Sequence, residues 1–116
     1  MAAMLIARSV GDVDRLREAY DRAHARIVSH GGASRFGELR HHCAVGNDAL
    51  DIIGVWDSEE SIRSRWSSDE FENTLISDGF PSPKSAEITI LQLQRSNQRS
   101  DDSEPKGRSG ARGSCQ

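Results

Sequence analysis

The stretch that decides the fold runs from Gly37 to Trp66 and reads GELRHHCAVGNDALDIIGVWDSEESIRSRW. Two segments rich in apolar residues, Glu38–Val45 and Ala49–Trp56, flank the turn sequence Gly-Asn-Asp and predict a β-hairpin. A helix is expected to follow directly, because Asp57 and Glu60 have the spacing of a capping box. This stretch also contains most of the residues that could take part in chemistry.

The segment before the hairpin predicts one strand and one helix. Met4–Val10 is an apolar run of strand length, and Asp12 is a suitable N-cap for a helix. Apolar residues then recur at helical spacing until Gly31-Gly32, and they are Val13, Leu16, Tyr20, Ala23 and Ile27.

The segment after the hairpin predicts a two-part helix and a last strand. Ser67 and Glu70 form a second capping-box pattern, and the apolar stripe restarts out of phase at Phe71. The helix is expected to end near Gly79, and Ala86–Gln94 is expected to form the last strand.

This order of elements predicts an α+β fold. It is a ferredoxin-like βαββαβ sandwich, with a four-stranded antiparallel sheet and both helices on one face. With Asn47-Asp48 as the hairpin loop, His41 pairs with Gly54 and Leu39 with Trp56 on the core face. The opposite face is half apolar, so we expect a homodimer in which the sheet of a second subunit covers it.

Composition predicts one folded domain over residues 1–94 and a disordered Ser/Gly/Arg-rich tail over residues 95–116, which contains no large apolar side chain. Residues 1–94 hold 10 Lys and Arg against 15 Asp and Glu, which argues against a nucleic-acid partner. The sequence shows no signal peptide and no transmembrane run, so we expect a cytoplasmic protein without a membrane partner.

Several strings resemble a known superfamily. They are LIAR at the start, LRHHCAV, DIIGVWDSEESIRSRW with SRWSSDEF, and the Gly-Phe-Pro-Ser-Pro loop. Together they resemble the dimeric α/β-barrel superfamily, and in particular small actinobacterial proteins of the antibiotic-biosynthesis-monooxygenase type. The resemblance implies a pocket for aromatic polyketides, with a Trp on the second helix that matches Trp66.

Two departures from the family pattern narrow the activity. Cofactor-independent oxygenases of this superfamily commonly place an Asn near the end of the first strand, but Arg8-Ser9-Val10 contains none. Haem-degrading members place a His late on the second helix, and residues 72–78 contain none. The resemblance therefore argues against haem cleavage and leaves polyketide oxygenation open.

His41 is the candidate catalytic residue. Strand alternation points it into the space between sheet and helices, and its partner Gly54 leaves room there for a ligand. An imidazole could deprotonate a phenol or an acidic C–H group. The alternative is a structural His hydrogen-bonded to the backbone. His42 faces the opposite side of the sheet, so the pair cannot share a metal ion, and no metal site is predicted.

Three aromatic side chains are candidate substrate-binding residues, namely Trp66, Tyr20 and Phe71. An aromatic lining suits a flat conjugated ligand, although each of the three could simply belong to the core.

The sequence thus predicts a protein resembling the cofactor-independent monooxygenases, which would bind an aromatic or polyketide-like molecule without flavin, metal or haem. A non-catalytic ligand-binding or stress-associated dimer of the same fold is one alternative. An isomerase or cyclase that uses the same pocket is another.

Overall fold

The computed structural model describes residues 1–94, and the expected tail over residues 95–116 lies outside this range. The strands and helices follow the predicted order, with the second helix in two parts. In chain order they are β1 (Ala3–Val10), α1 (Val13–Ser29), β2 (Glu38–Val45), β3 (Ala49–Trp56), α2 (Glu59–Trp66), α3 (Asp69–Ser77) and β4 (Glu87–Gln92). Two short 3-10 turns, η1 (Ala33–Phe36) and η2 (Pro83–Ser85), precede β2 and β4.

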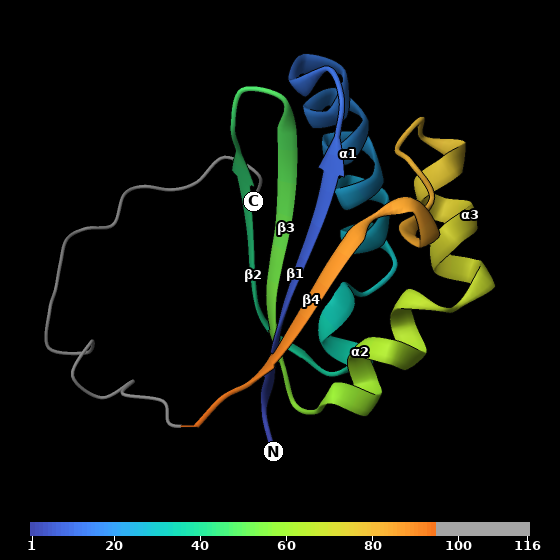
Figure 1. The fold of residues 1–116 in the computed structure, drawn as a ribbon. Coiled ribbons are helices and arrows are strands. Elements are labelled where there is room, and N and C mark those ends of the chain that lie inside the picture. Colours follow the sequence, from blue (N-terminus) through green and yellow to red (C-terminus); the bar gives the residue numbers. More distant parts are fainter. Residues whose placement is uncertain (95–116) are drawn as a thin grey trace, which may run out of the picture.

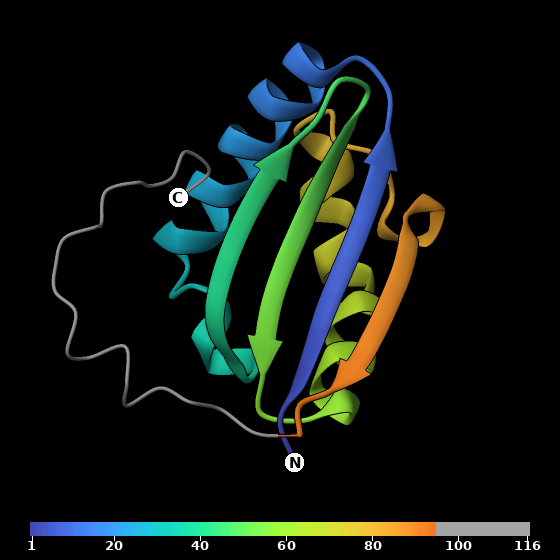
Figure 2. The same cartoon turned by 60° about the vertical axis from the view of Figure 1, so that its left-hand side comes forward.

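The four strands form one antiparallel sheet in the order β2-β3-β1-β4. The helices of residues 1–94 lie together on one face of this sheet, and none of them lies on the other face (Figures 1 and 2). This is the ferredoxin-like α+β sandwich that the sequence predicts. The arrangement leaves a layer between helices and sheet where both the core and the candidate site lie.

Side-chain caps define where the helices begin. Asp12 caps α1 as predicted, because its carboxylate accepts a hydrogen bond from the backbone N–H of Arg15. The predicted caps of the other two helices are wrong by one residue. Ser58 caps α2 and Ser68 caps α3, each accepting from the backbone N–H three residues later. Adjacent capping-type residues, Asp57-Ser58 and Ser67-Ser68, make this choice ambiguous in the sequence.

The core fills the layer between sheet and helices. Leu5, Leu50, Ile62 and Leu75 are its largest fully buried side chains, and they come from strands and helices alike. Burying a side chain of this size contributes roughly 1.5–3 kcal/mol, so this layer supplies most of the folding free energy.

A β-bulge between Glu38 and Arg40 changes the predicted hairpin register at one end. Val45, Cys43 and His41 pair with Leu50, Ile52 and Gly54 as expected, but Glu38 rather than Leu39 pairs with Trp56. The inserted residue reverses the alternation of faces beyond it. Glu38 is therefore buried and Leu39 is 62% exposed.

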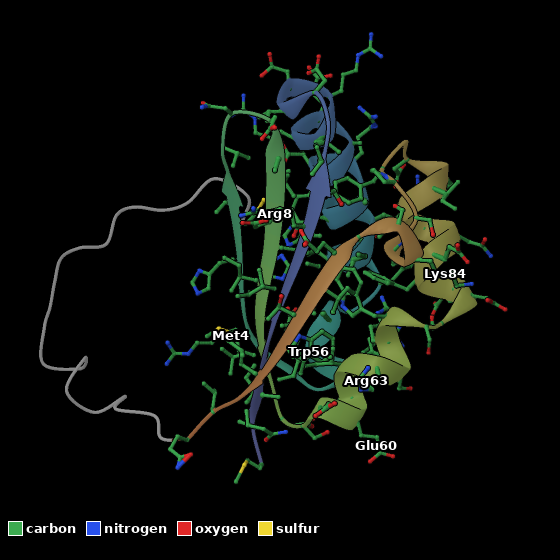
Figure 3. The ribbon with its side chains drawn as sticks, in the orientation of Figure 1. Met4, Arg8, Trp56, Glu60, Arg63 and Lys84 are labelled. Carbon is green, nitrogen blue, oxygen red and sulfur yellow. The ribbon has the colours of Figure 1, made fainter. Side chains whose placement is uncertain are left out.

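The face of the sheet away from the helices is half apolar. Figure 3 shows Met4 and Arg8 on this side of the sheet and Trp56 on the helix side. Met4, Ile6, Ile53 and Val55 are partly exposed, and Leu91 is 50% exposed.

Within residues 1–94, no helix is both long and apolar enough to span a membrane.

Candidate functional site

A cavity of about 280 Å³ lies between the sheet and the helices. Most of its wall is apolar or aromatic, with Leu5, Ile27, Ile52, Trp56, Phe71 and Leu75 among the lining residues. A small set of polar and amphipathic side chains interrupts this wall, and they are Tyr20, His24, Ser34, Glu38, Arg40, His41, Arg65 and Trp66. A mostly apolar hollow with a few convergent polar groups is typical of a small-molecule site.

Three of the polar groups form a continuous hydrogen-bonded chain. His41 Nδ1 lies 2.9 Å from Glu38 Oε2, and His41 Nε2 is hydrogen-bonded to the Tyr20 hydroxyl. A carboxylate only accepts, so the proton of a neutral His41 is placed on Nδ1 and donates to Glu38. Nε2 then accepts from Tyr20. A carboxylate, an imidazole and a phenol thus follow one another, in the order needed to move a proton from the phenol hydroxyl to the imidazole.

The β-bulge brings together Glu38 and His41, the first two members of this hydrogen-bonded chain. Residues three apart on a regular strand face opposite sides of the sheet, so Glu38 and His41 would not meet. The bulge between Glu38 and Arg40 turns both residues to the helix side. The Glu38 side chain is 7% exposed, and its hydrogen bond to His41 offsets part of the cost of burying a carboxylate.

Gly54 makes room for this carboxylate. A Cβ atom at Gly54 would lie 2.5 Å from Glu38 Oε2 and 2.7 Å from Trp56 Nε1, both shorter than real contacts of this kind. The space beside Gly54 is thus filled by Glu38 and Trp56, and Gly54 is not among the residues that line the cavity. Gly54 therefore affects the site only through the room that it leaves for Glu38 and Trp56.

A second histidine, His24, lies beside this hydrogen-bonded chain. The His24 ring stacks on those of Tyr20 and His41, with centroid separations of 5.6 Å and 5.4 Å. Burial, together with the charge that His41 can carry, lowers the pKa of His24 below its usual 6.5. Burial also raises the pKa of Tyr20, with Glu38 adding to this effect. Both groups are therefore neutral at pH 7, and Tyr20 keeps its hydroxyl proton.

The helix side of the cavity carries a group of aromatic rings and one cation. Trp66 and Phe71 meet edge to face with their centroids 5.0 Å apart. The guanidinium carbon of Arg65 lies 3.9 Å from the centroid of Phe36 and 4.6 Å from that of Phe71. The rings provide a flat apolar surface, and Arg65 provides a positive charge beside them.

The structure brings most of the sequence-predicted residues together. His41, Tyr20, Trp66 and Phe71 all line the cavity, while His42 pairs with Ile53 on the opposite face of the sheet. Within the described residues, no group of three or more His, Cys, Asp or Glu could hold a metal ion.

Sequence reasoning missed three residues of the site, Glu38, His24 and Arg65. His24 carried a detectable signal, because it lies four residues after Tyr20 on the same helix, where side chains become neighbours. Glu38 and Arg65 carried none, because charged residues are rarely buried and local patterns place them in solvent.

Comparison with protein-family models and with curated protein sequences finds no match. Solved structures do match. A conserved protein from Methanosarcina mazei Go1 is 15% identical with a TM-score of 0.59, over 81% of this chain and 94% of that one. A variant of SnoaB, a cofactor-independent oxygenase from Streptomyces nogalater, is 14% identical with a TM-score of 0.57, over 83% and 96%.

A third similar structure contains a ligand. It is a monooxygenase from the gene ActVA-Orf6 of Streptomyces coelicolor in complex with nanaomycin D, 14% identical with a TM-score of 0.50, over 82% of this chain and 88% of that one. These likenesses confirm the predicted fold, which this chain shares with SnoaB and with the ActVA-Orf6 monooxygenase. At these identities the likeness establishes the architecture alone.

Proposed function

We propose that this protein is a cofactor-independent monooxygenase-like enzyme that binds an aromatic or polyketide-like molecule in the cavity. The observation that carries the proposal is the Glu38–His41–Tyr20 chain in the wall of an aromatic-lined cavity of about 280 Å³. The oxygenases among the structural neighbours support the same assignment, since they show that this architecture hosts such chemistry.

His41 is the general base in this proposal. Its Nε2 already accepts a hydrogen bond from Tyr20, so a substrate proton reaches it through the Tyr20 oxygen. The substrate protonates that oxygen as the phenol proton moves to Nε2. Glu38 then faces an imidazolium across 2.9 Å, and this charge pair stabilises the protonated base.

The substrate itself supplies the electrons. Loss of a proton from an anthrone-like methylene gives a carbanion, which adds to dioxygen and regains a proton to give a hydroperoxide. Loss of water then leaves a carbonyl, so the methylene and O₂ become C=O and H₂O. Trp66 and Phe71 would hold the rings of the substrate by stacking and apolar burial.

Oxygen uptake with an anthrone tests the proposal. His41→Ala is expected to reduce the initial rate by about 10²–10⁴-fold, the usual contribution of a general base. His42→Ala is the matched control, because His42 is the adjacent residue on the opposite face and should leave the rate unchanged. An unchanged rate in His41→Ala would overturn the assignment of the base. Product formation without oxygen uptake would instead indicate an isomerase or cyclase.

We also propose that the protein is a homodimer. The sheet face without helices carries partly exposed Met4, Ile6, Ile53 and Val55, and a second sheet would cover them. Sedimentation at micromolar concentration should give twice the chain mass. A monomer under these conditions would contradict the proposal.

A further inference from the structure

Arg65 is a buried cation in the wall of the cavity. It lies on α2 next to Trp66 and is 7% exposed, and its guanidinium carbon lies 3.9 Å from the ring centroid of Phe36 and 4.6 Å from that of Phe71. The guanidinium is therefore in contact with two aromatic rings. Only its edge, where the N–H donors point, can meet an acceptor.

The partners of this cation within the described residues compensate its charge incompletely. One ion pair joins Arg65 to Glu70, at 3.4 Å, and the Glu70 side chain is 67% exposed. The Nε atom of Arg65 is buried and has no hydrogen-bond partner among residues 1–94. Burial lowers the pKa of Arg65, which is the expected response of a cation held away from water. A buried charge with one long pairing is costly unless something else compensates it.

The acidic group of the cavity wall, Glu38, supplies only part of that compensation, because its charge opposes the lowering of the Arg65 pKa less than the charge of Glu70 does. Glu38 also lines the cavity, but its carboxylate accepts the hydrogen bond from His41 at 2.9 Å. Arg40 lines the cavity as well but is exposed, so Arg65 is the buried positive group that a ligand can meet, beside the rings of Trp66 and Phe71.

We propose that Arg65 binds an acidic group on the ligand, so that the preferred ligand is an aromatic compound bearing a carboxylate or an ionised phenol. The rings of the ligand would lie against Trp66 and Phe71, and its anionic group would meet the edge of the guanidinium. This inference rests on the same cavity as the proposed function, but it concerns binding and requires no turnover.

The test uses two probes that differ in charge and little else, 2-naphthoate and 2-naphthamide. Calorimetric titration of the wild-type protein at neutral pH should show at least about tenfold tighter binding of the carboxylate, the size expected of one charge-assisted hydrogen-bonded pair. Arg65→Met should bind the amide as before and lose the preference for the carboxylate. Arg65→Lys should keep part of it, because it retains the charge and loses the planar fork.

The matched control is Arg63→Met. Arg63 lies on the same helix, pairs with Glu59 at 2.7 Å and has a side chain that is 66% exposed. Its loss removes one positive charge from α2 without changing the cavity, so the preference for 2-naphthoate should be that of the wild type. This control separates a local contact from a general effect of net charge.

Three results would overturn the inference: equal affinity of the two probes in the wild type, binding of neither probe, or an unchanged preference in Arg65→Met. If Arg65→Met fails to fold by circular dichroism, the wild-type comparison and Arg65→Lys still decide the matter. A charge preference without oxygen uptake would refute the proposed enzymatic function and leave this inference intact. Oxygen uptake without a charge preference would do the reverse.

Discussion

The two faces of the sheet carry the same kind of acid–base pair in opposite environments. On the helix-free face, Arg8 donates from Nε and an Nη atom to the two carboxylate oxygens of Asp51, each at 2.9 Å. On the helix side, His41 donates to Glu38 at the same distance. The Arg8 and Asp51 side chains are 51% and 20% exposed, whereas those of His41 and Glu38 are 25% and 7% exposed. The donor–acceptor distances are thus equal, but the pairs differ in burial.

The difference shows what burial does to a charged pair. The Arg8–Asp51 pair joins β1 to β3, but water screens it, so it contributes little to stability. The Glu38–His41 pair lies beside a cavity, where the local dielectric is lower and charge interactions are stronger. The predictions that follow compare the two faces, from the largest expected effect to the smallest.

The largest effect on stability is expected from Gly54→Ala on the helix side. The added Cβ would lie 2.5 Å from Glu38 Oε2, so the carboxylate or the Trp56 ring must move. Overpacking of this kind costs about 1–3 kcal/mol in the free energy of unfolding, measured by urea denaturation. Gly46→Ala in the hairpin turn is the control, because a Cβ there meets only the Ala49 carbonyl at 3.9 Å. Equal stability of the two variants would show that the packing around Glu38 is loose.

Glu38→Gln and Asp51→Asn compare the two carboxylates directly in the oxygen-uptake assay. Glu38→Gln keeps the shape of the side chain but removes the charge that stabilises the imidazolium, so kcat should fall at least about tenfold. KM should change much less, because Glu38 acts through His41. Asp51→Asn should leave both constants unchanged. Equal effects of the two changes would remove the functional distinction between the faces.

The partly buried His24, beside the hydrogen-bonded chain, predicts a loss of stability in mild acid. The pKa of His24 is lowered first by burial and then by the charge of His41, while Glu38 and Asp21 oppose the shift. The unfolded chain therefore binds a proton below about pH 6.5 more readily than the folded chain. The thermal midpoint should fall as the pH drops from about 7 to 5, and His24→Gln should reduce this slope. An identical slope in the variant would show that His24 is as easily protonated in the folded state.

The smallest effect is expected for the exposed pair. Arg8 lowers the pKa of Asp51, chiefly through their hydrogen bonds. The ionised carboxylate then stabilises the fold above the unfolded pKa of about 3.9, and this contribution is lost as the pH falls through the lower folded value. Asp51→Asn should lower the thermal midpoint slightly at neutral pH, and this difference between the variant and the wild type should disappear as the pH falls below the folded pKa of Asp51. A difference that persists in acid would indicate a role for Asp51 other than its charge.

The local patterns of the sequence predicted the fold because they agree with one another. The turn after Val45 places His41 opposite Gly54, and Asp12 begins the first helix, as the structure shows. Only short-range rules are needed for these features, since turn chemistry and helix caps depend on neighbours in the chain. Where two capping residues are adjacent, as at Asp57-Ser58, the same rules fail by one position.

The site could be predicted only in part. Hydrophobic periodicity and strand alternation placed His41, Tyr20, Trp66 and Phe71 around one space, and all four line the cavity. The same alternation placed Glu38 on the wrong face, because nothing in the sequence of residues 38–42 indicates the bulge. Strand pairing against β3 produces the bulge, so it is a property of two strands and not of one.

By itself, then, the sequence determined the order of elements, the hairpin and the inward direction of His41, because backbone preferences and side-chain periodicity act over a few residues. The tertiary structure alone decided that Glu38 and Arg65 are buried and that His41 lies between a carboxylate and a phenol. Whether a charged side chain faces water or a cavity depends on what packs over it, and segments far apart in the chain supply that cover.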